Sequence, residues 1–340
     1  MRHYLLPETG YFYKANLHCH TYLSDGKMTP EQVKEAYTRR GYQIVAFTDH
    51  DVLLPHDALR DENFLPLNGC EVEVNKPGTG PWPTMTTMHM NCIAIEPDNL
   101  YQPCYHRERY LYANAVNQRH LLKVDESKPD FVREYSAEGV SRMMRDARES
   151  GFFVIYNHPG GSREWYPEYM GYHGMHAMEI ANGATMRNGS YGYCPEVYDD
   201  MLRGGEHILI TAGDDNHSLD NGTRRCEIGW AWTMIKAEAL EYRAVMQALL
   251  AGHSYVSTGP EIHALWYEDG KVHIACSPAD RIFMRVGNRR ENRQALAEDG
   301  VLLTEAIFDV HPEVDWFRIC VVDERGRTAD TNAYFLDALK

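Results

Sequence analysis

Several kinds of segment are missing from this sequence. It has no run of five or more Lys or Arg, and its formal net charge is −15, which argues against nucleic-acid binding as the main role. No stretch approaches the roughly 20 apolar residues of a membrane-spanning helix. The N-terminal residues lack a positive segment followed by a long apolar run. We therefore expect a cytoplasmic protein that binds neither nucleic acid nor membrane.

Paired cysteines and a serine-hydrolase motif are missing as well. The eight cysteines are scattered, and none forms a Cys-x-x-Cys pair, so we expect reduced, packed thiols. No Gly-x-Ser-x-Gly motif points to a serine nucleophile. The acidic charge does not exclude an anionic substrate, because bound divalent cations would reverse the local field.

Seven apolar runs rich in β-branched or aromatic residues predict strands in the first three quarters of the 340-residue chain. They cover residues 15–20, 43–50, 65–73, 88–95, 152–159, 177–183 and 208–217. Predicted helices separate several of these strands, at residues 29–41, 105–125, 136–151 and 195–205. Such alternation favours parallel β/α units, and seven strands suit a closed or nearly closed barrel with its active site at the C-terminal strand ends.

The last part of the sequence changes character. After a predicted helix over residues 237–252, short alternating runs separated by turn signals continue to the end of the chain. They predict a small all-β unit, built as a sandwich. We place the two domains at residues 1–258 and 259–340.

Six of the seven predicted strands carry imidazole or carboxylate groups near one end. These groups are His18 and His20, His50, Glu71, His89, His158, and Asp215 with His217. Side chains at i and i+2 of a strand share a face about 7 Å apart, so His18 and His20 would project side by side. Histidine with carboxylate suits Zn²⁺, Mn²⁺ or Fe²⁺. The number of ligands exceeds the needs of one ion and predicts two or three divalent metal ions.

The order of these motifs resembles that of the PHP (polymerase and histidinol phosphatase) superfamily of metal-dependent phosphoesterases. The resemblance rests on "NLHCHTYLSDG", "FTDHD", "GCEVE", "NHP" and "GDDNH", which follow one another within residues 15–217. It implies a distorted (β/α)₇, TIM-like barrel. With its β-rich tail, the chain is similar to two-domain bacterial members of the superfamily.

Carried over by motif, the resemblance implies a trinuclear site. The first metal would take His18, His20, Glu71 and Asp215. The second would take Glu71 as a bridge, with His89 and His158. The third would take Asp25, His50 and His217, and these three are assigned to catalysis together with a metal-bridging hydroxide. Alternatives stay open at two positions: His106 or His120 for His89, and Asp214 for Asp215. We expect Asp49 and Asp51 to support ligands or turns.

Such a centre would make the protein a hydrolase of a small phosphate monoester or of a cyclic or linear phosphodiester. A metal bridge lowers the pKa of water from about 15.7 toward about 7, and the hydroxide could attack phosphorus. Arg163 and Arg187, in loops after the fifth and sixth predicted strands, are candidates for binding the phosphate. His173 and His176 are candidate general acids.

Two other functions stay open. The same hydroxide could cleave an amide, a carbamate or a carboxylic ester. Alternatively, the barrel would be a non-enzymatic scaffold or binding protein, as in some polymerase-attached PHP domains that have lost ligands. The C-terminal tail would cover one side of the barrel or form the interface of a homodimer.

Overall fold

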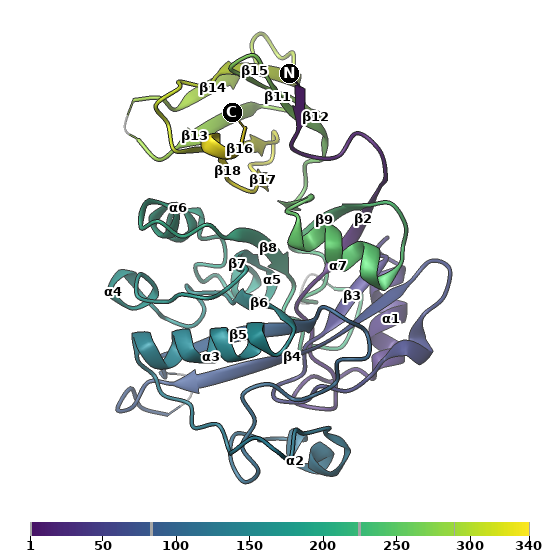
Figure 1. Cartoon of the computed structure of the whole chain (residues 1–340). Helices are drawn as coiled ribbons and strands as arrows, with labels where there is room; N and C mark the ends of the chain where they lie inside the picture. Colours follow the sequence, from purple (N-terminus) through teal and green to yellow (C-terminus); the bar gives the residue numbers. More distant parts are fainter. Residues whose placement is uncertain (1, 82–83, 224–225, 289, 340) are drawn as a thin grey trace.

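The structure, a computed structural model, describes residues 2–81, 84–223, 226–288 and 290–339. One sheet contains seven strands that follow one another in chain order and correspond to the seven predicted ones (Figure 1). They are β2 (Tyr11–Asn16), β3 (Ile44–Phe47), β4 (Leu65–Asn75), β5 (Thr87–Ala94), β6 (Phe152–Tyr156), β7 (Ala177–Asn182) and β8 (Leu209–Gly213). The predicted strand 15–20 is misplaced, because β2 ends at Asn16, before the histidine pair.

The strands β2, β3 and β4 are parallel, and so are β6, β7 and β8. The prediction of uniformly parallel units is wrong for β5, which runs antiparallel to both β4 and β6. The connection between Asn75 and Thr87 is too short for a helical crossover, which needs a dozen or more residues. The reversal has a consequence for the site, because it pairs His89 with Glu73 across the ladder.

The strand β8 returns toward β2, but no ladder joins the two among the described residues. A single parallel bridge links Cys19 to Asn216, beyond the ends of both strands. There, the Asp215 backbone N–H donates to the His18 carbonyl at 2.9 Å, and the His20 N–H donates to the Asn216 carbonyl at 3.1 Å. The architecture is therefore a mixed α/β sheet, and these hydrogen bonds bring the first and last predicted ligand motifs together.

Helices form where capping residues precede amphipathic segments. The first helix, α1 (Pro30–Thr38), has a capping box in which Thr29 and Gln32 exchange hydrogen bonds. In α3 (Ala137–Glu149), Ser136 caps the first turn and the apolar face is buried. The remaining α-helices outside the β5–α3 connection are α4 (Tyr166–Tyr169), α5 (Gly183–Arg187), α6 (Pro195–Arg203) and α7 (Tyr242–Leu250). The predictions for α1, α3 and α6 are confirmed within a few residues.

The predicted helix over residues 105–125 is wrong. Only α2 (Ala115–Gln118) and the 3₁₀ turn η2 (Arg119–Leu121) form there, apart from the sheets at the lower end of Figure 1. Tyr110 and Ala113 have φ values of +75° and +47°, which a right-handed helix cannot contain. Its apolar contacts are limited to a small cluster, in which Ala115, with Leu111 and Leu122 beside it, packs against Leu23 and Val52.

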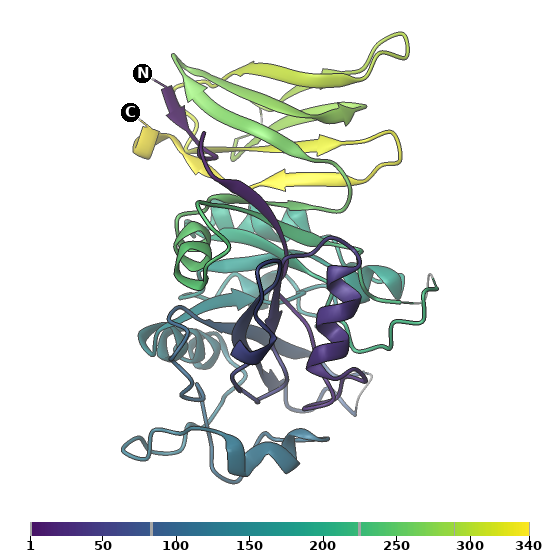
Figure 2. The same cartoon turned by 90° about the vertical axis from the view of Figure 1, so that its right-hand side faces the viewer.

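The C-terminal part forms two antiparallel β layers that share an apolar core (Figure 2). One layer has the order β1-β11-β12-β15, and the other continues the large sheet as β14-β13-β16-β17-β10-β9. Their bounds are β1 (Arg2–Tyr4), β9 (Trp232–Ala237), β10 (Ser254–Ser257), β11 (Ile262–Glu268), β12 (Lys271–Ala279), β13 (Arg281–Val286), β14 (Arg293–Leu296), β15 (Leu303–Asp309), β16 (Trp316–Val322), β17 (Thr328–Thr331) and β18 (Tyr334–Phe335). Two further 3₁₀ turns are η1 (Asp57–Leu59) and η3 (Leu336–Leu339). The domain boundary at residue 258 stays a prediction.

All eight cysteines are free and buried, which confirms the prediction of packed thiols. Of the helices in the described ranges, none is both long and apolar enough to cross a membrane.

Candidate metal centre

The predicted ligands converge at one end of the large sheet. Most lie just beyond a strand end, while Glu71 and His89 lie within β4 and β5. The complete set is His18, His20, Asp25, His50, Glu71, His89, His158, Asp215 and His217. Groups drawn from this set bring at least three ligand atoms within 4.8 Å of one another. The structure thus collects all nine side chains, and their assignment as metal ligands stays a prediction.

The tightest group is the set predicted for the first metal. Asp215 Oδ1 lies 3.2 Å from His18 Nε2 and 3.1 Å from His20 Nε2. The two Nε2 atoms are 3.2 Å apart. Glu71 completes the group, with Oε1 at 3.2 Å from His18 Nε2 and Oε2 at 3.3 Å from His20 Nε2. Bonds of 2.0–2.1 Å to a tetrahedral ion would separate its ligands by about 3.3–3.4 Å. These spacings therefore fit one ion.

Buried polar atoms without hydrogen-bond partners support the fit. Within the described residues, His20 Nδ1, His50 Nδ1 and Asp215 Oδ1 accept or donate no hydrogen bond. Asp215 Oδ1 lies close to two ring nitrogens, yet not in hydrogen-bond geometry. A buried unsatisfied polar group costs about 1–3 kcal/mol. Imidazole and carboxylate are the donors that Zn²⁺, Mn²⁺ and Fe²⁺ accept, so the residues present suit such ions.

Glu71 also faces the set predicted for the second metal. Its Oε1 is 3.0 Å from His89 Nδ1 and 3.3 Å from His158 Nε2. Asn157 Nδ2 donates a hydrogen bond to the same oxygen at 2.7 Å, which fixes the carboxylate. Because its two oxygens reach both sets, Glu71 has the geometry of a bridging ligand.

Asp25 lies between the two histidines predicted to bind the third metal with it. Its Oδ2 is 3.5 Å from His217 Nε2 and 3.7 Å from His50 Nε2. His20 Nδ1 lies 3.6 Å from the other oxygen of Asp25. This group is wider than the first and is also more exposed at its rim.

Outer hydrogen bonds orient the histidines toward the centre. His18 Nδ1 lies 3.2 Å from Glu179 Oε1, and His158 Nδ1 lies 3.0 Å from Ser162 Oγ. His217 Nδ1 is 2.9 Å from the Asp215 carbonyl oxygen. In each case the other ring nitrogen, Nε2, faces the proposed ligands, which is the usual arrangement of metal-binding histidines.

Sequence reasoning missed three carboxylates at this site. Glu73 Oε2 is 3.3 Å from His89 Nε2, and Glu179 contacts His18. Glu227 accepts hydrogen bonds from the backbone of His217 at 2.6 Å and of Ser218 at 3.0 Å. Glu73 could have been found from its i+2 spacing after Glu71, and Glu179 from its place in an otherwise apolar strand. No signal marked Glu227, which reaches the site from a loop.

The other aspartates of the ligand motifs serve the backbone or a salt bridge. Asp49 accepts hydrogen bonds from Thr21 and Ser24, in the turn that carries the first ligands. Asp51 forms a buried ion pair with Arg133. Asp214 accepts from the backbone N–H groups of residues 229 and 230 at 2.9 Å. These placements favour Asp215 over Asp214 as the ligand.

The predicted phosphate-binding arginines and general acids take different positions. Arg163 is exposed in the turn after His158. Arg187 is paired with Glu227 at 3.1 Å. His173 pairs with Glu206 at 2.6 Å, and His176 precedes β7, at the opposite end of that strand from the centre. The two histidines are therefore not at the site. The same holds for His106, which contacts Asp130, and for exposed His120.

The proposed ligands shift one another's pKa values. Burial alone would lower the pKa of His20, but Asp215 and Glu71 outweigh it and raise the pKa to about 10. Burial lowers the pKa of His50 to about 3. Burial alone would raise the pKa of Glu71, but the neighbouring histidines, His18 first, hold it well below its ordinary value. The Glu71 carboxylate therefore stays charged and attracts cations.

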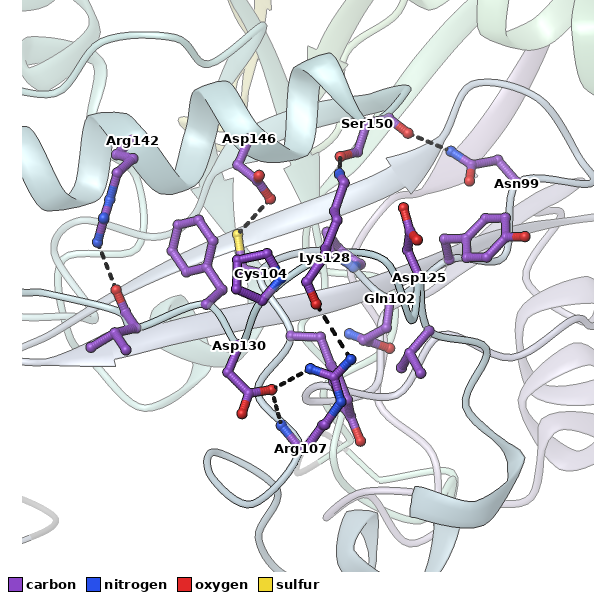
Figure 3. A pocket seen from close by; sticks show the side chains of 17 residues that line it. Asn99, Gln102, Cys104, Arg107, Asp125, Lys128, Asp130, Arg142, Asp146 and Ser150 are labelled. Atoms are coloured by element: carbon purple, nitrogen blue, oxygen red, sulfur yellow. Dashed lines mark hydrogen bonds and ion pairs between the residues drawn. The ribbon is translucent and has the colours of Figure 1, made fainter.

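A separate cavity of about 410 Å³ lies beside α3, and Figure 3 shows its lining. None of the nine proposed ligands lines it. Its cations are engaged, since Arg107 pairs with Asp130 at 2.7 Å and Lys128 Nζ donates to Ser150 Oγ at 3.2 Å. The cavity therefore has no part in the metal centre.

Comparison with known proteins identifies the larger part of the chain. The model of the family described as PHP domain matches residues 16–203. No curated protein matches the chain. Among solved structures, the chain is similar to a two-domain protein from Bacteroides vulgatus that contains a predicted PHP-like metal-dependent phosphoesterase, with 16% identity over 97% of this chain and 89% of that one, and a TM-score of 0.45.

Two other solved structures are similar to this chain. One, named as a metal-dependent phosphoesterase from Bifidobacterium adolescentis, has 17% identity over 63% of this chain and 90% of that one, with a TM-score of 0.38. The other is an amidohydrolase from Chromobacterium violaceum with bound sulfate and no metal. It has 16% identity over 71% of this chain and 96% of that one, with a TM-score of 0.37.

Proposed function

Because the chain belongs to the PHP domain family, we propose that it hydrolyses a small phosphate monoester or a cyclic or linear phosphodiester in a trinuclear metal site. The observation that carries the proposal is the group of His18 Nε2, His20 Nε2 and Asp215 Oδ1, spaced 3.1–3.2 Å apart. Such spacing suits ligands of one ion, and Glu71 extends the site to a second. We also propose that β2 to β8 form a distorted barrel, that residues 259–340 are a second domain, and that the protein works in the cytoplasm.

Divalent ions bound here would lower the pKa of water and withdraw negative charge from the phosphoryl oxygens. The chain's own residues set the geometry for this chemistry. Glu179 and Ser162 each contact the outer nitrogen of a histidine, so that His18 and His158 turn Nε2 inward. Glu227 holds the backbone of His217 in place through two N–H donors. No protein nucleophile is required.

A second candidate function is hydrolysis of an amide, carbamate or carboxylic ester by the same centre. The pairing of Arg187 with Glu227 favours it, since the ion pair takes one Nη group of this guanidinium and offsets part of the charge that a phosphate would need. In the phosphoesterase proposal the substrate's charge is met by the ions, with exposed Arg163 and the unpartnered Nε of Arg187 as the candidate cations from the sequence.

The test is phosphate release from a panel of phosphomonoesters and cyclic phosphodiesters. The protein is purified without chelator and assayed with added Mn²⁺, Fe²⁺ or Zn²⁺. His18→Ala/His20→Ala is the inactive variant, and His263→Ala, which changes an exposed histidine, is the matched control. We expect metal-dependent turnover that only the double variant loses. No turnover by protein with bound metal would favour amide or ester cleavage, and the same preparations would be assayed on such substrates.

A further inference from the structure

A tyrosine that no motif marks lies against the proposed metal centre. The ring centroid of Tyr112 is 5.2 Å from that of His50. Its phenol lies within electrostatic reach of Glu73, Asp25 and Glu71, three carboxylates of the centre. The side chain is half-buried.

The loop that carries Tyr112 is anchored on both sides of this residue. Two positions earlier, the Tyr110 hydroxyl accepts a hydrogen bond from the Arg133 N–H at 2.9 Å, and Arg133 pairs with Asp51. Two positions later, Asn114 donates from its backbone to the Ser24 carbonyl and from its side chain to residue 22, both at 3.0 Å. Asp51 follows the proposed ligand His50, and Ser24 precedes the proposed ligand Asp25, so both anchors tie the loop to segments that carry ligands.

The backbone on either side of Tyr112 is strained. Tyr110 and Ala113 are in the left-handed region, at φ values of +75° and +47°. Each such residue costs of order 1–3 kcal/mol and persists only where its surroundings determine it. The hydrogen bonds made by Arg133 and Asn114 hold these two residues in the left-handed region. The strained residues and their anchors together fix the backbone that carries Tyr112.

The Tyr112 hydroxyl has no hydrogen-bond partner within the described ranges. The tyrosines around Glu164 differ, because the hydroxyls of Tyr135, Tyr156 and Tyr172 all donate to that carboxylate. A free donor beside several carboxylates would be attracted by a further anionic oxygen that enters the site. Arg187 contacts Glu227 through Nη2 at 3.1 Å, and its buried Nε has no hydrogen-bond partner within the described residues.

We infer that Tyr112 is a catalytic residue: its neutral hydroxyl donates a hydrogen bond to a non-bridging phosphoryl oxygen of the substrate. The inference rests on the proposed phosphoesterase function. No proton is transferred, so the phenol stays intact throughout. A donor aimed at an oxygen on which charge develops stabilises the transition state more than the ground state.

Tyr112→Phe tests the inference, because it keeps the ring against His50 and removes only the hydroxyl. We expect kcat for phosphoester hydrolysis to fall about 10- to 100-fold, by the same factor for good and poor leaving groups. We expect orthovanadate, measured by calorimetry on metal-loaded protein, to bind at least about tenfold more weakly. Bound metal should stay at the wild-type level. Tyr101→Phe, which changes an exposed tyrosine of the same connection, is the matched control and should match wild type.

Three outcomes would overturn the inference. Wild-type turnover and vanadate binding in Tyr112→Phe would show that the hydroxyl touches no phosphoryl oxygen. A loss that grows with the pKa of the leaving group would place the hydroxyl on the leaving oxygen instead. A loss of bound metal would make Tyr112 a support of His50. If the wild-type protein itself hydrolyses no phosphoester, the proposed function falls and the inference falls with it, so the two failures are distinguishable.

Discussion

Two of the buried clusters of charged side chains differ in how their charges are satisfied. In the Arg318 cluster, the guanidinium donates to Asp199 at 2.7 Å and to Asp330 at 2.8 Å, and Tyr193 donates to the second oxygen of Asp330 at 2.8 Å. In the metal centre, by contrast, ring nitrogens face one another and Asp215 Oδ1 has no hydrogen-bond partner among the described residues.

This difference separates a structural cluster from a functional one. The Arg318 cluster joins α6 to β16 and β17, and its ionic groups are paired within the protein. Burial of charge is therefore not in itself a sign of a site. Unpaired, convergent donor atoms are the better sign, because their cost is recovered only when something binds. The predictions below test this contrast in order of decreasing effect.

Glu71→Gln should have the largest effect, and this effect should be on kcat and on bound metal. The amide cannot bridge two ions, so we expect a fall in kcat of about 10³-fold or more, equivalent to about 4 kcal/mol, with loss of bound metal. Steady-state kinetics and elemental analysis of bound metal would measure both. Glu261→Gln, at an exposed carboxylate, should behave as wild type. Retention of full metal content in Glu71→Gln would contradict the bridging geometry.

Arg318→Met should lower stability and leave metal binding and catalysis unchanged, which is the opposite of the pattern expected for Glu71→Gln. It leaves buried Asp330 and half-buried Asp199 without their cation, so we expect the free energy of unfolding to fall by about 3–5 kcal/mol. Bound metal and kcat should stay close to wild type below the unfolding transition. Urea denaturation would measure the loss, with exposed Arg285→Met as the control on neighbouring β13. A loss below about 1 kcal/mol would mean that this cluster is not a structural clamp.

Removal of metal should destabilise the protein through the metal centre alone. At free metal about 100-fold above its Kd, binding to the folded state contributes about 2.7 kcal/mol. We expect thermal or urea unfolding with and without chelator to show this difference in wild type and in Arg318→Met. Glu71→Gln should show a much smaller one. Equal stabilisation of all three proteins would place the metal elsewhere.

A pH effect at Glu164 should be the smallest of the four. Burial raises the pKa of Glu164 from 4.5 to about 7, although three tyrosine donors oppose the shift. Protonated Glu164 therefore stabilises the folded state. This contribution to the free energy of unfolding is complete below about pH 4.5 and is lost as the pH rises through about 7. Relative to Glu164→Gln, wild-type stability should fall by about 2 kcal/mol between pH 5 and 7. If the difference in unfolding free energy between wild type and Glu164→Gln did not change with pH, the raised pKa of Glu164 would be refuted.

Much of the fold could be predicted because the signals are local. The cap at Thr29 and Pro30 marks α1, and Ser136 marks α3, each before an amphipathic segment. The direction of β5 could not be predicted, because an apolar run indicates a buried strand but not whether it pairs parallel or antiparallel to its neighbours. The helix predicted over residues 105–125 is wrong because the conformation of this segment depends on distant anchors such as Arg133 and Ser24.

The candidate site divides in the same way. Ligand motifs with i, i+2 spacing, such as His18 with His20, are visible in the sequence. Glu179 and Glu227 act on other residues and Tyr112 lies in an irregular loop, so only the folded chain brings them to the centre. Residues whose role depends on a partner far along the chain carry no local pattern.

The central claim is that divalent ions bind within the group of His18, His20, Glu71 and Asp215. Crystals of the protein grown with Mn²⁺ or Zn²⁺, measured at the absorption edge of that metal, would test it most directly. We expect an anomalous peak among His18 Nε2, His20 Nε2 and Asp215 Oδ1, with a second peak on the other side of Glu71. Saturated protein without an anomalous peak in this group, or with its only peak elsewhere, would contradict it.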